Sequence, residues 1–192
     1  FVMDIDLSRP GMEIFLAVEA LHDKDGLGIC LRDAKTGTLI WKIGRPTVHV
    51  GSGMVADVDP ALHGLECFAA EDPKGHRAMG ITGNNNRYLF DANGNLYGTG
   101  EDVPPTGDWV WWDADKLREY IRPEGRGKGF TIAKYHYKDE EEIVQMGFEG
   151  NVVLVADLYG DWREEIVTAL PGELRIYSTT IPAKDRRVTL LQ

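Results

Sequence analysis

Paired carboxylates recur along this sequence at a fixed spacing, and they are the residues whose arrangement could support chemistry. Two segments read D-x-D-x-x-x-x-G-x-E and continue into an apolar strand, a third copy is one residue shorter, and a weak fourth runs from Asp113 through Asp115 to Glu119. The carboxylates of the three clear copies are Asp4, Asp6 and Glu13; Asp57, Asp59 and Glu66; and Asp157, Asp161 and Glu165.

Alternate acidic side chains in a tight, glycine-containing turn can converge on one centre, as the oxygen ligands of Ca²⁺ do. No His or Cys stands beside these carboxylates, which makes Zn²⁺ and softer metals less suitable. The pattern therefore predicts Ca²⁺ at these loops. The alternative is that each Asp starts a turn and each Glu is exposed at the entrance of a strand.

The acidic loops also reveal a repeat. Their leading aspartates are Asp4, Asp57, Asp113 and Asp157, which are 53, 56 and 44 positions apart and average 51. That period suits a propeller blade of about four short strands. We expect an all-β chain, a β-propeller with about four blades present, forming one domain over residues 1–192.

Hairpin signals lie between the acidic loops, with a glycine-containing turn between two short apolar runs. The turns are 33–37 and 91–95, and further strands are expected at 152–155, 173–177 and 187–191. The best candidate for a helix, 139–146, is short and rich in charge. Because a three-to-four-blade piece leaves edge strands unpaired, we expect an incomplete propeller whose remaining blades lie outside this chain.

Charge and composition exclude several classes. The net charge of −10 argues against a nucleic-acid partner, because the phosphate backbone would be repelled. No apolar run approaches the length of a membrane span, and residues 1–20 carry acidic side chains where a signal peptide would be apolar, so any export signal is removed or lies outside the chain. Cys30 and Cys67 stand within apolar runs and read as small buried hydrophobes.

Longer motifs carry a resemblance to a known family. The segment 156–166 contains GDWREE and is followed by LRIYSTT at 174–180, with further similar stretches at 31–37, 53–60 and 111–115. On these residues the chain resembles the rhamnogalacturonan lyases of polysaccharide lyase family 11. The resemblance implies a secreted, extracellular, eight-bladed propeller that holds several calcium ions and cleaves the pectin backbone, with this chain as its C-terminal part.

The chain departs from the family's pattern at two places. Ser52 stands where the resemblance implies an Arg, and residues 148–151 replace an Asn-Gly-Thr-Lys segment, without a Lys. These departures indicate a divergent branch with a relocated base or a different uronic-acid substrate.

Cleavage of a uronate chain by β-elimination needs a neutralised carboxylate, a base for the C5 proton and an acid for the C4 leaving oxygen. Ca²⁺ can neutralise the uronate carboxylate as a Lewis acid. Bound Ca²⁺ would also make the local charge of the cleft positive, so the net charge of −10 does not exclude an acidic polysaccharide as substrate. His49, just before the position of the family's Arg, is the first choice for the base. Lys134 and His136, alternating with tyrosines in an expected strand, are the reserve; the alternative for that run is an amphipathic edge strand.

Residues expected to bind the sugar are Arg45, Asn84 and Asn85, although a turn also explains the asparagines. Trp109, Trp111 and Trp112 are expected in the core, with sugar stacking as the alternative. The turn at 33–37 followed by Trp41 also resembles the blades of quinoprotein propellers. An oxidoreductase is therefore an alternative function. The predicted function is a calcium-dependent polysaccharide lyase acting on rhamnogalacturonan or a related uronan; the alternative is a non-catalytic, calcium-stabilised propeller that binds glycans or proteins.

Overall fold

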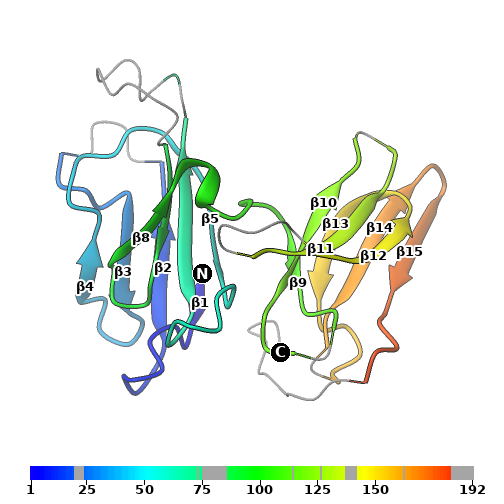
Figure 1. The fold of residues 1–192 in the computed structure, drawn as a ribbon, viewed down its shortest axis with the longest axis horizontal. Helices are drawn as coiled ribbons and strands as arrows, with labels where there is room; N and C mark the ends of the chain where they lie inside the picture. Colours follow the sequence, from blue (N-terminus) through cyan, green and yellow to red (C-terminus); the bar gives the residue numbers. More distant parts are fainter. Residues whose placement is uncertain are drawn as a thin grey trace. The chain divides into compact units, whose positions relative to one another are not determined.

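The computed structural model describes residues 1–19, 24–72, 74, 86–113, 115–125, 127–136, 142–161 and 163–182. The strands form four antiparallel sheets that follow one another along the chain (Figure 1). Within the described part, no helix is long and apolar enough to cross a membrane. The predicted all-β, propeller-like arrangement of four blades is confirmed.

Two compact units hold two sheets each, and the first unit is Phe1–Thr106. Its first sheet is made of β1 (Val2–Met3), β2 (Glu13–Ala17), β3 (Ile29–Asp33) and β4 (Leu39–Lys42). Its second sheet is made of β5 (Val50–Ala56), β6 (Glu66–Glu71), β7 (Arg87–Phe90) and β8 (Leu96–Thr99), followed by the 3-10 turn η1 (Gly100–Asp102). Each strand pairs with the next one along the chain.

The second unit is Gly107–Gln192. Its third sheet contains β9 (Trp109–Val110), β10 (Glu119–Pro123), β11 (Phe130–Lys134) and β12 (Glu142–Phe148). Its fourth sheet contains β13 (Asn151–Ala156), β14 (Glu165–Leu170) and β15 (Glu173–Tyr177). The expectation of a single domain stays a prediction, as does the number of blades in the whole propeller.

The predicted hairpin turns are present and are closed by their aspartates. Asp33 Oδ1 accepts the backbone N–H of Thr36 at 2.7 Å between β3 and β4. Asp91 Oδ1 accepts the N–H groups of Asn93 and Asn95, both at 2.9 Å, between β7 and β8. The strands expected at 152–155 and 173–177 are also confirmed, as β13 and β15; residues 187–191 lie outside the described residues.

The helical candidate at 139–146 was wrong, because residues 142–148 form strand β12. This strand is the last of its sheet and pairs only with β11, with two shifts of register. As an edge strand, β12 leaves several side chains exposed, among them Ile143 at 41% and Met146 at 67%. Residues 137–141 lie outside the described residues.

Trp41 of β4 joins the cores of the first and second sheets. Its ring lies 6.1 Å from that of Phe15 and 5.2 Å from that of Phe90, and its Nε1 donates to the carbonyl of Ala92 at 3.0 Å. Gly94, with φ +84°, lets the turn approach the indole, because a Cβ there would lie 2.5 Å from Trp41 Cγ. Trp41 is thus a packing residue between sheets.

Three further tryptophans and both cysteines are core residues. Trp109, Trp111 and Trp112 are 2%, 9% and 1% exposed, so the packing interpretation is confirmed over sugar stacking. Trp112 packs edge-on against Phe148 at 5.4 Å, and its Nε1 donates to Gln145 Oε1 at 2.7 Å. Both cysteines are buried, as expected.

The link made by Trp41 can be measured. We expect Trp41→Ala to lower the free energy of unfolding by about 3 kcal/mol, because a large side chain is removed from between two sheets. Trp41→Phe keeps most of the packing but leaves the Ala92 carbonyl without its donor, and should cost about 1 kcal/mol. Urea denaturation measures both; equal losses for the two variants would contradict the packing role.

Candidate functional site

A buried glutamate occupies the first position of the second strand in every sheet. These residues are Glu13 on β2, Glu66 on β6, Glu119 on β10 and Glu165 on β14, and none is more than 1% exposed. Each follows the acidic loop that joins the first strand to the second. The sequence repeat is therefore a structural repeat, and it includes the weak fourth copy.

The glutamates close the loops by accepting backbone N–H groups. Glu13 Oε2 accepts from Ile5 at 2.9 Å and from Asp6 at 3.2 Å. Glu66 Oε2 accepts from the equivalent pair, Val58 at 2.8 Å and Asp59 at 3.1 Å. Carboxylate acceptors make stronger hydrogen bonds than neutral ones, so each glutamate fixes the conformation of its loop.

The other two loops are held in the same way. Glu119 Oε2 accepts the N–H of Trp112 at 2.9 Å. Glu165 Oε2 accepts the N–H of Leu158 at 2.9 Å, while its Oε1 accepts the Ser178 hydroxyl at 3.2 Å. Loop closure by glutamate is thus common to all four sheets.

In the second loop, one oxygen of the buried Glu66 lacks, within the described part of the chain, a partner that a cation could supply. Glu66 Oε1 is buried and has no hydrogen-bond partner among the described residues. Burial, with Asp57 and Asp59 nearby, raises the pKa of Glu66 from 4.5 to about 8. A bound cation would supply the missing partner and favour the charged form. This buried oxygen is therefore one donor that a hard divalent ion could use.

Six of the nine carboxylates predicted to bind metal lie in the loops and three begin the strands that follow, yet they do not converge closely. Among the described residues, the carboxylates with ligand atoms within 4.8 Å of one another are Asp113, Asp115 and Glu119. The other aspartates serve their own turns: Asp6 Oδ1 accepts the N–H of Ser8, and Asp59 Oδ1 accepts that of Ala61. Calcium at the nine residues stays a prediction.

Replacing Glu66 by Gln should affect the protein in opposite directions with and without Ca²⁺. At pH 8 in chelator, Glu66→Gln should raise Tm, because an unpartnered buried carboxylate costs about 1–3 kcal/mol or more. In millimolar Ca²⁺ the variant should lose part of the stabilisation that the native protein gains. Thermal melting in both buffers measures this, with the exposed Glu101→Gln as the matched control.

The same residue sets a pH dependence. A carboxyl group whose folded-state pKa is raised binds its proton more tightly when folded, so its contribution to stability is lost as pH rises from 4.5 to about 8. Without Ca²⁺, the gap in Tm between native protein and Glu66→Gln should close at pH 5. A gap that does not change with pH would contradict the assignment.

Arg45, predicted to bind substrate, is engaged inside the protein. Its Nη2 lies 2.5 Å from Glu71 Oε2 and also donates to the Tyr88 hydroxyl, and the guanidinium stands 5.0 Å from the centre of the Tyr88 ring. Burial opposes the charge of Arg45, but the bond to Glu71 outweighs it and raises the pKa of Arg45. Glu71 Oε1 also accepts the N–H of Val48 at 3.0 Å. Arg45 and Glu71 thus fix the segment that leads into β5.

This segment presents His49, the residue predicted as the base. The His49 side chain is 43% exposed, and its Nδ1 lies 2.7 Å from Glu19 Oε1. The His49 carbonyl accepts the N–H of Asp72 at 2.7 Å, which ties the backbone to the end of β6. A carboxylate that orients a partly exposed imidazole is the arrangement of a general base and its positioning residue.

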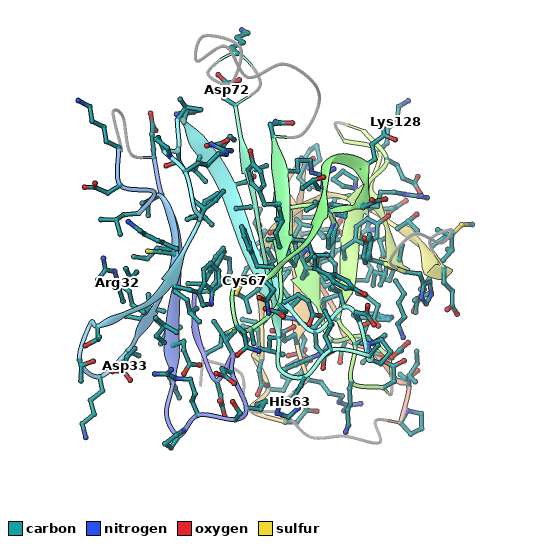
Figure 2. All side chains as sticks on the ribbon, turned by 60° about the vertical axis from the view of Figure 1, so that its left-hand side comes forward. Arg32, Asp33, His63, Cys67, Asp72 and Lys128 are labelled. Carbon is teal, nitrogen blue, oxygen red and sulfur yellow. The ribbon has the colours of Figure 1, made fainter. Side chains whose placement is uncertain are left out.

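The acidic loops and His49 lie at opposite ends of the strands. In β5 and β6, Val50 pairs with Glu71 while Ala56 pairs with Glu66. Glu66 and Glu71 are therefore about 17 Å apart along β6 at the rise of an extended strand. Figure 2 shows the same separation, with Asp72 at one end of the sheet and His63 at the other.

The reserve bases behave differently from one another. Lys134 is buried, and its Nζ donates to Asp113 and Asp115, each at 2.6 Å. Burial would lower the pKa of Lys134, but these two bonds outweigh it and raise the pKa, which keeps the group protonated, unlike a base. His136 is 37% exposed and lies 3.3 Å from Glu142. Asn84 and Asn85 lie outside the described residues.

Comparison with known proteins decides the family. The model of the family "Rhamnogalacturonan lyase family 11, C-terminal domain" matches residues 1–192. The chain belongs to rhamnogalacturonan lyase family 11. This confirms the resemblance drawn from the GDWREE, LRIYSTT and Asp-x-Asp segments.

Curated relatives of this family 11 chain come from Bacillus subtilis (strain 168). Rhamnogalacturonan endolyase YesW is 35% identical over 200 residues, covering 98% of this chain and 28% of that protein. Rhamnogalacturonan exolyase YesX is 34% identical over 196 residues, covering 93% and 30%. The chain thus spans about three tenths of the length of the curated relatives it matches.

Solved structures agree with the sequence relatives. A crystal structure of rhamnogalacturonan lyase YesW superposes with a TM-score of 0.70 at 34% identity, covering 99% of this chain and 30% of that one. Rhamnogalacturonan lyase PL11 of Bacillus licheniformis gives 0.70 at 31% identity, covering 100% and 30%. The family 11 fold therefore extends over the whole chain.

At Ser52, where the resemblance implies an Arg, the family 11 chain has a hydroxyl that lies 2.5 Å from the Thr106 hydroxyl. Ser52 stands within β5, three residues beyond His49. Ser52 thus makes a neutral hydrogen bond where the family has a charged side chain. His49 is a titratable group near the start of the same strand.

Proposed function

We propose that the protein containing this chain cleaves rhamnogalacturonan by β-elimination. The observation that carries the proposal is the family 11 match over residues 1–192, together with relatives named as a rhamnogalacturonan endolyase and a rhamnogalacturonan exolyase. Since the chain spans about three tenths of those relatives, the activity belongs to the whole protein, with the remaining blades outside this chain. Because the substrate is a polymer of the plant cell wall, we also propose that the protein is secreted.

His49 is the base that this chain contributes. The reaction removes the C5 proton of the uronate, forms the C4–C5 double bond and expels the C4 oxygen, which takes up a proton. His49 has an exposed imidazole, a carboxylate at 2.7 Å from Nδ1 and a backbone fixed by Asp72. Nε2 is then the nitrogen that receives the C5 proton, since Nδ1 faces Glu19.

Calcium has a structural place in this proposal. The residues that would hold it at the second loop are Asp57, Asp59 and Glu66, and the ion would supply the positive charge that the buried Glu66 carboxylate needs. This loop is about 17 Å from the His49 end of the strands. A Ca²⁺ ion bound there is too far away to neutralise a uronate carboxylate beside His49, so another group must do so. Calcium dependence would then appear as stability of the blades.

A direct assay tests the activity. β-Elimination leaves an unsaturated uronate that absorbs in the ultraviolet, so the full-length protein is incubated with rhamnogalacturonan, homogalacturonan and other uronans while absorbance is recorded. We expect an increase with rhamnogalacturonan. A full-length, folded protein that leaves the absorbance of the whole panel unchanged would refute the lyase.

His49→Ala should lower turnover by about 10²-fold or more, because general-base catalysis contributes that much. The matched control is His63→Ala, which removes an exposed imidazole at the opposite end of the second sheet and should leave turnover unchanged. Melting temperatures of both variants establish that they are folded. Full activity of His49→Ala would remove His49 from the mechanism, and His136→Ala would then be assayed in the same way.

A second candidate function is a non-catalytic propeller that binds glycans or proteins. The observation that favours it is the internal pairing of Arg45 with Glu71 and of Lys134 with three acidic residues, which leaves both basic groups serving the fold. Binding of rhamnogalacturonan without any rise in absorbance is the result that would support this alternative.

A further inference from the structure

The third acidic loop holds a buried lysine among three carboxylates, whereas the cation of the fourth loop, Arg163, pairs with Asp161 and is partly exposed. The Lys134 side chain is 6% exposed, and its Nζ lies 2.6 Å from Asp113 Oδ2, 2.6 Å from Asp115 Oδ2 and 3.3 Å from Glu119 Oε1. These are the three carboxylates whose ligand atoms lie within 4.8 Å of one another. The ammonium group therefore stands where a shared metal ion would stand.

Strand register explains why the third loop alone receives this lysine. Glu119 on β10 pairs directly with Lys134 on β11, whereas Glu13 on β2 pairs with Asp33 on β3. In the fourth sheet the corresponding place belongs to Ser178, which follows Tyr177 and donates its hydroxyl to Glu165. The same position thus holds an acid, a lysine and a hydroxyl in these three sheets.

The length of the third loop is the second difference. Asp113 and Glu119 are six positions apart, whereas the leading aspartate and the glutamate are nine positions apart in the first two loops and eight in the fourth. The shorter loop brings its carboxylates together around one point. Three carboxylates this close repel one another unless a cation lies among them, and Lys134 supplies that cation from the next strand.

We propose that the Lys134 ammonium is the permanent cation of the third loop, which therefore neither needs nor binds a divalent ion. The residues at this loop do not fit the metal that the family 11 resemblance implies, because an ion at the usual 2.3–2.6 Å from these oxygens would occupy the space of Nζ. Glu66 Oε1 and Glu119 Oε1 are both buried without a hydrogen-bond partner among the described residues, but Glu119 Oε1 has the Lys134 ammonium at 3.3 Å. This inference holds whether or not the protein is a lyase.

The experiment compares the calcium content of full-length variants after dialysis against buffered Ca²⁺, measured by atomic emission. Asp113→Asn with Asp115→Asn removes two charges from the loop but keeps oxygens that can accept the turn hydrogen bonds. Lys134→Met keeps the aliphatic volume and removes the ammonium. The exposed Lys128→Met is the matched control. Thermal melting in chelator and in millimolar Ca²⁺ accompanies each measurement.

We expect the Asp113/Asp115 double variant and Lys128→Met to hold as much calcium as the native protein. Lys134→Met should hold one calcium ion more per chain, and its Tm should fall in chelator and recover in Ca²⁺, because the ion replaces the lost ammonium. Adding both Asn substitutions to Lys134→Met should abolish the extra ion.

Two results would overturn the proposal. A double variant that loses one calcium ion relative to the native protein would show that the native loop binds metal. A folded Lys134→Met that gains no ion would show that the ammonium does not hold a cation site. If Lys134→Met fails to fold in either buffer, the calcium content of the double variant alone decides whether the native third loop binds Ca²⁺.

Discussion

Each sheet of this chain depends on one buried carboxylate, the glutamate that begins its second strand. Such a group is costly to bury unless its oxygens have partners. One oxygen is always satisfied by backbone N–H groups of the loop before it, as for Glu13 with Ile5 and Asp6. The second oxygen is satisfied differently from sheet to sheet, and that difference determines what each loop can bind.

The second, third and fourth loops show three solutions to this constraint. Glu165 receives a hydroxyl from Ser178, Glu119 faces the ammonium of Lys134, and Glu66 has no partner for Oε1 among the described residues. Burial raises the pKa of both glutamates, that of Glu119 to about 7 and that of Glu66 to about 8.

Within the first unit, the second acidic loop and the predicted base His49 lie at opposite ends of the strands. The second acidic loop lies where β5 ends and β6 begins, while His49 and Glu71 lie at the other ends of the same strands. Arg45 belongs to the second group, since it pairs with Glu71 and Tyr88 and so holds the segment that carries His49. Loss of a cation from the acidic loops and loss of the imidazole are thus separable perturbations.

The sequence by itself determined the features that depend on near neighbours: the repeat of about 51 residues, the turns closed by Asp33 and Asp91, and the glutamate at each strand entrance. The sequence did not distinguish a short helix at 139–146 from the edge strand that residues 142–148 form, because both leave side chains exposed. Only tertiary structure decided that Lys134 lies among the acidic side chains of the third loop and that Arg45 is paired with Glu71. The Lys134 contact follows from its pairing with Glu119 across β10 and β11, and a shift of one residue in register would remove it, whereas Arg45 reaches Glu71 from the segment before β5.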